Sequence, residues 1–225
     1  MWERTSYRNK LLLWVMPVLL LGLIALAAGA YWYNHKVVEE ELTQSMLATA
    51  EKAAEGLDLW SRMLVVEPET IAATPAAKAI NESFTQIDAQ NLNRKKFLQS
   101  NYPDLFLDIY AANRDGVYHT LYFEGNEGRV YVGDVSNREY FQSIMSGGGT
   151  QLTPPMVSRT TGKPTIFAVA PILDENDKPQ GLVGAGISLG YVEKMAQSMR
   201  VGETGYGIIV AKAGTFIYHP RRAFI

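Results

Sequence analysis

The sequence predicts an α+β fold, in which an N-terminal transmembrane helix continues into a long stalk helix that leads to an antiparallel sheet covered by helices. Three observations carry this prediction: an uncharged apolar run near the N-terminus, a helical apolar stripe after it, and strand-like patterns from Leu105 onward. A second module is expected to begin at residue 201.

The apolar run covers residues 11–33 and contains no charged residue. A helix of about 23 residues, rising about 1.5 Å per residue, crosses a hydrocarbon layer of about 30 Å. Basic residues precede the run and glutamates follow it, so the positive-inside rule predicts that residues 1–10 are cytoplasmic and the rest extracytoplasmic. The alternative is a cleaved signal peptide, because Ala28-Gly29-Ala30 fits a small-x-small cleavage site.

A helical stripe follows the apolar run. From Val38 to Leu64, apolar residues recur at steps of three and four, as on one face of a helix. We expect residues 34–66 to form a stalk helix that breaks at Glu67-Pro68-Glu69. The stripe has two interpretations: packing on the chain's own domain, or pairing with a second copy in a parallel homodimer. Both can hold for different turns, and we expect the combination.

Composition excludes several classes of protein. The net charge is −2 and the longest basic run is Arg94-Lys95-Lys96, so nucleic acid is not an expected partner. The absence of cysteine excludes disulfides, thiolate metal sites and a cysteine nucleophile. The three histidines are scattered, and no Gly-x-Ser-x-Gly turn occurs. We therefore expect no enzymatic activity, no metal site and no cofactor in this stretch.

Residues 67–200 are expected to form one module of helices followed by strands. Turn residues between apolar runs predict antiparallel hairpins. The expected helices are 76–89, 92–101 and 191–200, and the expected strands are 105–111, 117–123, 165–172 and 181–189. One more hairpin, 205–211 with 215–219, then starts a second module at residues 201–225. Because two strands alone are marginal, we expect this second module to be truncated.

Ser136 and Glu139 have the spacing of a capping box, which predicts a short helix that ends at Gly147-Gly148-Gly149. Arg138 would then lie in the first helical turn, where the helix dipole favours anions rather than cations. Two interpretations stay open: a site for a carboxylate ligand, or an internal ion pair with Asp134.

Small residues mark the last expected strand. Gly184, Gly186 and Ser188 share one face of it, which indicates a close approach by a helix or by a small molecule. The preceding loop, residues 152–164, contains Pro154-Pro155 and is expected to wall a pocket.

These residues resemble a known family. Residues 134–141 match the D-x-S-x-R-x-Y-F segment of double Cache (dCache) domains, the extracytoplasmic sensors of bacterial transmembrane receptors such as methyl-accepting chemotaxis proteins. Further matches are Ser158-x-x-Thr161-Gly162-x-Pro164, Ala170-Pro171-Ile172, and residues 205–220. The resemblance implies a PAS-like membrane-distal module at residues 67–200 and the beginning of a membrane-proximal one at 201–225.

In the amino-acid-binding branch of that family, an arginine and two following aromatic residues grip the ligand carboxylate, and Arg138, Tyr140 and Phe141 match them. A tyrosine and an aspartate of that branch are replaced here by Met156 and Ser158, and the aspartate that holds the ligand amine falls at Gly186. The resemblance therefore implies a small carboxylate or other anion rather than a plain amino acid. The candidate ligand-binding residues are Arg138, Tyr140, Phe141, Tyr131, Asp134, Met156, Ser158, Phe167 and Gly186.

The resemblance implies extracytoplasmic small-molecule sensing and transmembrane signalling at the plasma (inner) membrane, as the ligand-binding part of a chemotaxis receptor. One alternative is the sensor region of a histidine kinase or diguanylate cyclase, whose effector enzyme would lie outside this stretch. An alternative of another class is a membrane-tethered binding or adhesion protein without signalling output.

Overall fold

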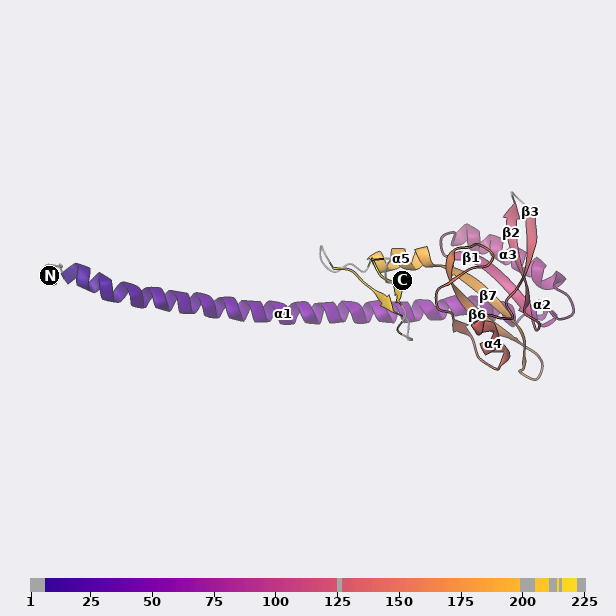
Figure 1. Cartoon of the computed structure of the whole chain (residues 1–225), viewed down its shortest axis with the longest axis horizontal. Coiled ribbons are helices and arrows are strands. Elements are labelled where there is room, and N and C mark those ends of the chain that lie inside the picture. The colour runs from indigo at the N-terminus through magenta and orange to yellow at the C-terminus, as the bar shows by residue number, and fades with distance from the viewer. Residues whose placement is uncertain (1–6, 125–126, 199–204, 211–213, 215, 222–225) are drawn as a thin grey trace. The chain divides into compact units, whose positions relative to one another are not determined.

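A computed structural model describes residues 7–124, 127–198, 205–210, 214 and 216–221 (Figure 1). By its internal contacts the chain divides into two units, Met1–Ala54 and Glu55–Ile225, and each is described by itself. The helices are α1 (Tyr7–Ala72), α2 (Pro75–Lys78), α3 (Thr85–Asn101), α4 (Glu139–Met145) and α5 (Leu189–Ser198). The strands are β1 (Phe106–Asn113), β2 (Val117–Glu124), β3 (Glu127–Asp134), β4 (Gln151–Leu152), β5 (Met156–Val157), β6 (Pro164–Leu173), β7 (Pro179–Ser188), β8 (Ile209–Val210) and β9 (Phe216–Tyr218).

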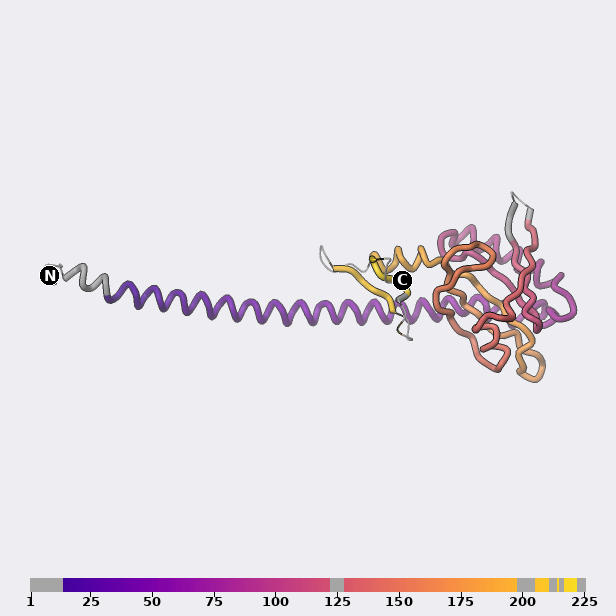
Figure 2. Tube along the Cα trace, viewed as in Figure 1, coloured from indigo at the N-terminus to yellow at the C-terminus, as the bar shows by residue number. Residues whose placement is uncertain are grey.

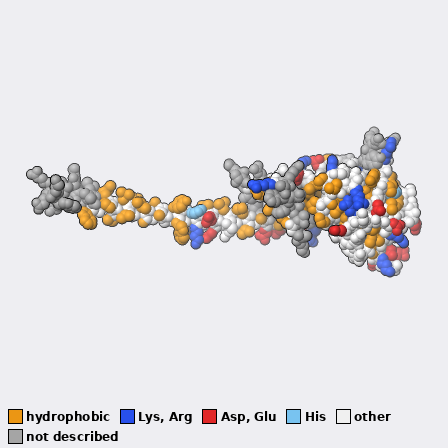
Figure 3. Space-filling view, in the orientation of Figure 1, with side chains coloured by type: hydrophobic (Ala, Val, Ile, Leu, Met, Phe, Trp, Pro, Cys, Tyr) orange, Lys and Arg blue, Asp and Glu red, His pale blue; other side chains and the backbone are white. Residues whose placement is uncertain are grey.

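The first unit is the N-terminal part of α1. Its large apolar side chains from Trp14 to Tyr33 are exposed, and Figure 3 shows hydrophobic side chains along this stretch. Among the described residues, α1 is the one helix long and apolar enough to cross a membrane, judged by length and composition. Exposed apolar side chains of this kind are stable in lipid and costly in water.

The predicted break of the stalk helix at Glu67-Pro68-Glu69 is wrong, because α1 continues to Ala72. Proline removes one helical hydrogen bond, yet tertiary packing compensates for that loss here. Leu64 and Ile71, on either side of the proline, are each 3% exposed and belong to the hydrophobic core of the second unit.

The second unit is built on a seven-stranded antiparallel sheet with the order β3-β2-β1-β7-β6-β4, in which β5 also pairs with β6. Strands β1 and β7 are far apart in the sequence and lie side by side (Figure 2). Tyr110 of β1 is opposite Gly184 of β7. Strand β6 completes the centre, with Phe167 opposite Gly186. The expected α+β fold with an antiparallel sheet is therefore confirmed.

Alternation along the central strands gives the sheet two different faces. The helical face carries Ile109, Val183 and Ile166, which pack against α1, α2, α3 and α5. The pocket face carries Tyr110 and Phe167, which pack against α4. Both faces are covered, so the central strands β6 and β7 are apolar almost throughout.

Several predicted boundaries need correction. The helix expected at 76–89 is wrong, because α2 ends at Lys78 and α3 begins only at Thr85. Between them, Asn81 bonds to the Gln180 carbonyl oxygen and accepts the Arg114 backbone N–H, which ties the chain to the sheet instead of to a helix. Strand β3 was missed: residues 124–128, where it begins, were expected to form a turn or loop, and no element was predicted at residues 129–134.

The hairpins expected around residues 105–123 and 165–189 are confirmed by β1–β2 and β6–β7. The third expected hairpin appears as β8 paired antiparallel with β9, and residues 211–213 and 215 of it lie outside the described residues. The division into modules at residues 67–200 and 201–225 stays a prediction.

Candidate functional site

A narrow cavity opens on the pocket face, between the sheet, α4 and the loop after β5; we call it the tyrosine cavity. Its volume is about 20 Å³, which is room for one or two waters. Any larger ligand therefore requires lining side chains to move. The cavity is lined by Asp108, Tyr110, Tyr118, Val135, Arg138, Tyr140, Ser158, Arg159, Thr160 and Phe167.

Arg138 lines this cavity from the position directly before α4. The predicted capping box is wrong: α4 begins at Glu139, Arg138 is its N-cap residue, and Ser136 precedes the helix. Arg138 has an extended backbone (φ −82°, ψ 135°), and its Nη2 donates to the Val157 carbonyl oxygen at 3.2 Å. The guanidinium is thus held between the start of α4 and β5.

Asp134 is engaged elsewhere. Its Oδ1 accepts the Ser136 backbone N–H at 2.6 Å, and hydrogen bonding from Ser136 lowers the pKa of Asp134. Arg159, rather than Arg138, bonds to this loop, donating to the Asp134 carbonyl oxygen and, at 2.8 Å, to Asn137 Oδ1. The described contacts of Arg138 do not include Asp134, and its side chain lines the cavity. They therefore favour the interpretation as a ligand site over that of an internal ion pair with Asp134.

Aromatic rings form the walls of the tyrosine cavity. The Tyr110 ring centroid lies 5.3 Å from that of Tyr118 and 5.8 Å from that of Phe167, both edge-on. Tyr140 stacks on Phe167 from α4, with ring centroids 6.2 Å apart. The Tyr118 hydroxyl lies 3.2 Å from the Thr160 hydroxyl. Aromatic walls of this kind suit a small ligand with an apolar part.

The Tyr110 hydroxyl is buried and has no hydrogen-bond partner among the described residues. Burial raises the pKa of Tyr110 well above its ordinary value, and the nearby Tyr140 adds to this rise, although the two hydroxyls do not meet the geometry of a hydrogen bond. A buried hydroxyl without a partner costs about 1–3 kcal/mol. A ligand atom or a water that bonded to it would recover part of that free energy.

The glycines of β7 are explained by these aromatic residues. A Cβ atom on Gly184 would lie 2.3 Å from Tyr110 Cε1, and one on Gly186 would lie 3.3 Å from Phe167 Cε1. The expected close approach is therefore made by aromatic side chains of the neighbouring strands. Neither a helix nor a ligand is needed to account for Gly184.

An ionic cluster at the cavity was not predicted from the sequence. Asp108 lines the cavity and is 4% exposed, and its Oδ1 lies 3.0 Å from the Nζ of Lys95, which is 6% exposed. Thr120 donates its hydroxyl proton to Asp108 Oδ1 or to the Ile109 carbonyl oxygen. Asp108 lies two positions before Tyr110 on β1, and this period of two is the sequence signal that places both on one face.

The structure brings only part of the predicted site together. Four predicted residues line the cavity, namely Arg138, Tyr140, Ser158 and Phe167. Three lie in or beside its hydrophobic wall, namely Phe141, Met156 and Gly186. Two are exposed outside it, namely Tyr131 and Asp134. Within the described parts of the chain, no group of three or more metal-ligating side chains occurs.

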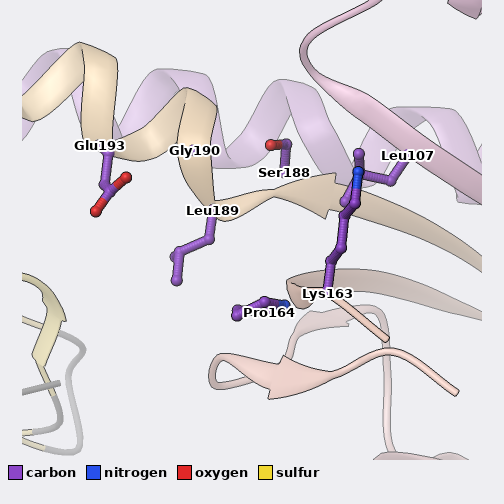
Figure 4. Close-up of a pocket in the computed structure, with 7 residues that line it drawn as sticks. All are labelled: Leu107, Lys163, Pro164, Ser188, Leu189, Gly190 and Glu193. Carbon is purple, nitrogen blue, oxygen red and sulfur yellow. The ribbon is translucent and has the colours of Figure 1, made fainter. Parts of the chain in front are cut away.

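A larger hollow of about 510 Å³ lies where β7 passes into α5 (Figure 4). It is open and mostly apolar, with Lys163 and Glu193 as its charged side chains. Size alone does not favour it as the ligand site. The smaller cavity is lined by the buried Asp108 carboxylate and by the buried Tyr110 hydroxyl, which has no hydrogen-bond partner among the described residues. Its lining residues are Leu107, Lys163, Pro164, Ser188, Leu189, Gly190 and Glu193.

Comparison with known families gives a match to the Cache domain over residues 34–225. The chain belongs to the Cache domain family. This confirms the resemblance to double Cache sensor domains that the sequence motifs indicated. The match covers the second unit and the part of α1 that follows the apolar run.

Two curated relatives are methyl-accepting chemotaxis proteins. PctB of Pseudomonas aeruginosa is 26% identical over 183 residues, which are 81% of this chain and 27% of PctB. PscA of Pseudomonas syringae is 29% identical over 119 residues, 53% of this chain and 18% of PscA. The chain thus spans about a quarter or less of these relatives.

Solved structures with the same fold are chemoreceptor ligand-binding domains. That of Pseudomonas fluorescens CtaA in complex with L-isoleucine has a TM-score of 0.65 at 19% identity, covering 84% of this chain and 73% of that one. That of Pseudomonas aeruginosa PctB in complex with L-Gln has a TM-score of 0.62 at 23% identity, covering 80% and 69%. At these identities the similarity shows the fold.

Proposed function

We propose that this chain is the extracytoplasmic sensing part of a chemotaxis receptor and that it binds a small carboxylate in the tyrosine cavity. The observation that carries the proposal is the placement of Arg138 at a cavity that holds the buried Tyr110 hydroxyl, which has no hydrogen-bond partner among the described residues. A guanidinium is the side chain best suited to hold a carboxylate, through two parallel hydrogen bonds. Membership of the Cache family and the chemoreceptor relatives support the same function.

The membrane part of the proposal rests on α1. Residues 11–33 would span the plasma (inner) membrane, with residues 1–10 cytoplasmic and the second unit extracytoplasmic. The stalk, residues 34–66, would pair with a second copy in a homodimer. Its exposed Val38, Leu42 and Met46 supply an apolar stripe for that contact. Ligand binding then signals only through different affinities for two states of the dimer.

The test is calorimetric titration of the full chain in lipid nanodiscs with propionate, L-lactate, succinate and L-malate. We expect at least one of them to bind, and Arg138→Ala to weaken that binding about ten- to hundredfold, because charged hydrogen bonds contribute about 1.5–3 kcal/mol. Arg114→Ala removes an exposed arginine of the β1–β2 turn and serves as the control. Equal affinity of the Arg138 and Arg114 variants would refute the proposed site.

The relatives also bear on the output. Both named relatives are methyl-accepting chemotaxis proteins, so we propose a chemotaxis receptor rather than a histidine kinase, a diguanylate cyclase or an adhesion protein. The experiment is to fuse the chain to the signalling part of a known chemoreceptor in cells that lack receptors. A carboxylate that binds in calorimetry should then change swimming behaviour, and a fusion that is inserted in the membrane but silent would contradict the proposed output.

A further inference from the structure

Asp108 occupies a special place in the tyrosine cavity. In the pairing of β1 with β7 it lies opposite Gly186. At the position of Gly186, the amino-acid-binding branch of the family has an aspartate that holds the ligand amine. A Cβ atom on Gly186 would lie 3.4 Å from Asp108 Cβ, so the two positions share one corner of the cavity. The cavity therefore contains a carboxylate near that corner, supplied by the neighbouring strand.

Lys95 reaches this carboxylate from the opposite side of the sheet. It lies on α3, whose Ile87 and Leu98 pack on the helical face, whereas Asp108 belongs to the pocket face. The described register of β1 with β2 runs only as far as Tyr110 opposite Thr120. Beyond that pair, the Nζ of Lys95 donates to the Leu121 carbonyl oxygen of β2 and to Asp108 Oδ1 of β1.

The Asp108 carboxylate already binds an ammonium group, that of Lys95, as a carboxylate in a ligand pocket would bind the ammonium group of an amino acid. Both described contacts of its carboxylate, from Lys95 and from Thr120, are made by Oδ1. A buried carboxylate is stable only with a charged or hydrogen-bonding partner. Here the partner is a side chain of the same chain, so the pair carries no net charge before any ligand arrives.

We propose that Lys95 is a built-in counter-ion that takes the place of a ligand amine at Asp108 and makes the site selective for carboxylates without an ammonium group. The inference rests on the proposed function and names its ligand class. An amino acid would bring a second cation close to Lys95, and like charges in a buried site repel. A hydroxyl or an apolar group at the same position brings no such repulsion.

The remaining charges of the cavity favour the same ligand class. Arg138 and Arg159 line it, while Asp108 is neutralised by Lys95. The acid expected at residue 158 is a buried serine, whose hydroxyl accepts the Thr161 backbone N–H. The lining therefore has an excess of positive charge, which suits an anion better than a zwitterion.

The experiment compares compounds that differ only in the amine. We would titrate the full chain in nanodiscs with L-lactate against L-alanine, and with L-malate against L-aspartate. The wild type should bind the hydroxy acid of at least one pair at least tenfold more tightly than its amino acid. Lys95→Met, which keeps the length of the stem but removes the charge, should shift this ratio at least tenfold toward the amino acid. Lys78→Met, an exposed lysine of α2, is the matched control.

A second variant covers the case in which Lys95→Met does not fold. In Lys95→Met with Asp108→Asn both charges are absent, so the chain has no uncompensated buried charge and should keep its preference for the hydroxy acid. A wild type that prefers L-alanine or L-aspartate in an Arg138-dependent manner would overturn the role of Lys95 and leave the proposed function intact. Absence of binding by all four compounds would overturn both.

Discussion

Replacement of Gly184 by alanine tests whether the aromatic walls of the cavity are rigid. The new Cβ would lie 2.3 Å from Tyr110 Cε1, where ordinary contacts begin at 3.4 Å, so the ring must move by about 1 Å. Tyr110 is 3% exposed and contacts the rings of Tyr118 and Phe167, and the cavity that it lines has room for only one or two waters. The ring therefore has little space to move into. Overpacking of this kind costs about 1–3 kcal/mol.

For a domain of this size, about 1 kcal/mol corresponds to about 2–4 °C in the melting temperature. Gly184→Ala should therefore lower the melting temperature by about 2–12 °C in thermal unfolding of the full chain in detergent. It should also weaken carboxylate binding, because the Tyr110 hydroxyl moves with its ring. The control is Gly149→Ala, whose Cβ would meet nothing within 4 Å. If both variants melt together with the wild type, Tyr110 is mobile and the walls are not rigid.

Three further outcomes follow from the same contacts. Arg94→Ala leaves the carboxylate of Glu67, which is 9% exposed, without its guanidinium partner. Guanidinium-chloride titration should show that the free energy of unfolding falls by about 1–3 kcal/mol. The control is Arg62→Ala, which removes one member of the exposed Arg62–Asp58 ion pair on α1, and an equal loss in both variants would contradict the prediction. Tyr110→Phe removes the unpartnered hydroxyl and should leave the free energy of unfolding unchanged or higher, whereas a loss above about 1 kcal/mol would show that the hydroxyl is satisfied. Because burial raises the pKa of Tyr110, the unfolded chain releases this proton first, and wild-type stability should fall as the pH rises above about 10. Tyr110→Phe should lose less stability between pH 8 and pH 11, and equal losses would assign that fall to other groups.

Local patterns predicted the strands of the core well, because apolar alternation and turn residues act over a few neighbouring positions. Elements decided by distant contacts were predicted poorly. Pro68 predicted the end of the stalk helix, but Leu64 and Ile71 bury themselves in the second unit and hold the helix together around it. Strand β3 was missed although Val130, Tyr131 and Val132 favour strands. It is an edge strand on which all three side chains are exposed, so burial does not mark it as part of the core.

The acid of the candidate site was not predicted because it lies on a different strand from the one that the motif indicates. The family motif places the amine-binding aspartate at the position of Gly186, where this chain has no acid. A side chain from another strand can occupy the same part of a pocket, however. The pairing of β1 with β7 places Asp108 next to Gly186, at the same corner of the tyrosine cavity. Its partner Lys95 lies within a basic run that composition alone would assign to a solvated surface, yet its side chain is 8% exposed. Strand register, which the sequence does not specify locally, brings Gly186 and Asp108 together, and the packing of α3 brings Lys95 to the same carboxylate. The acid that could hold a ligand amine is then already paired with a lysine of the chain.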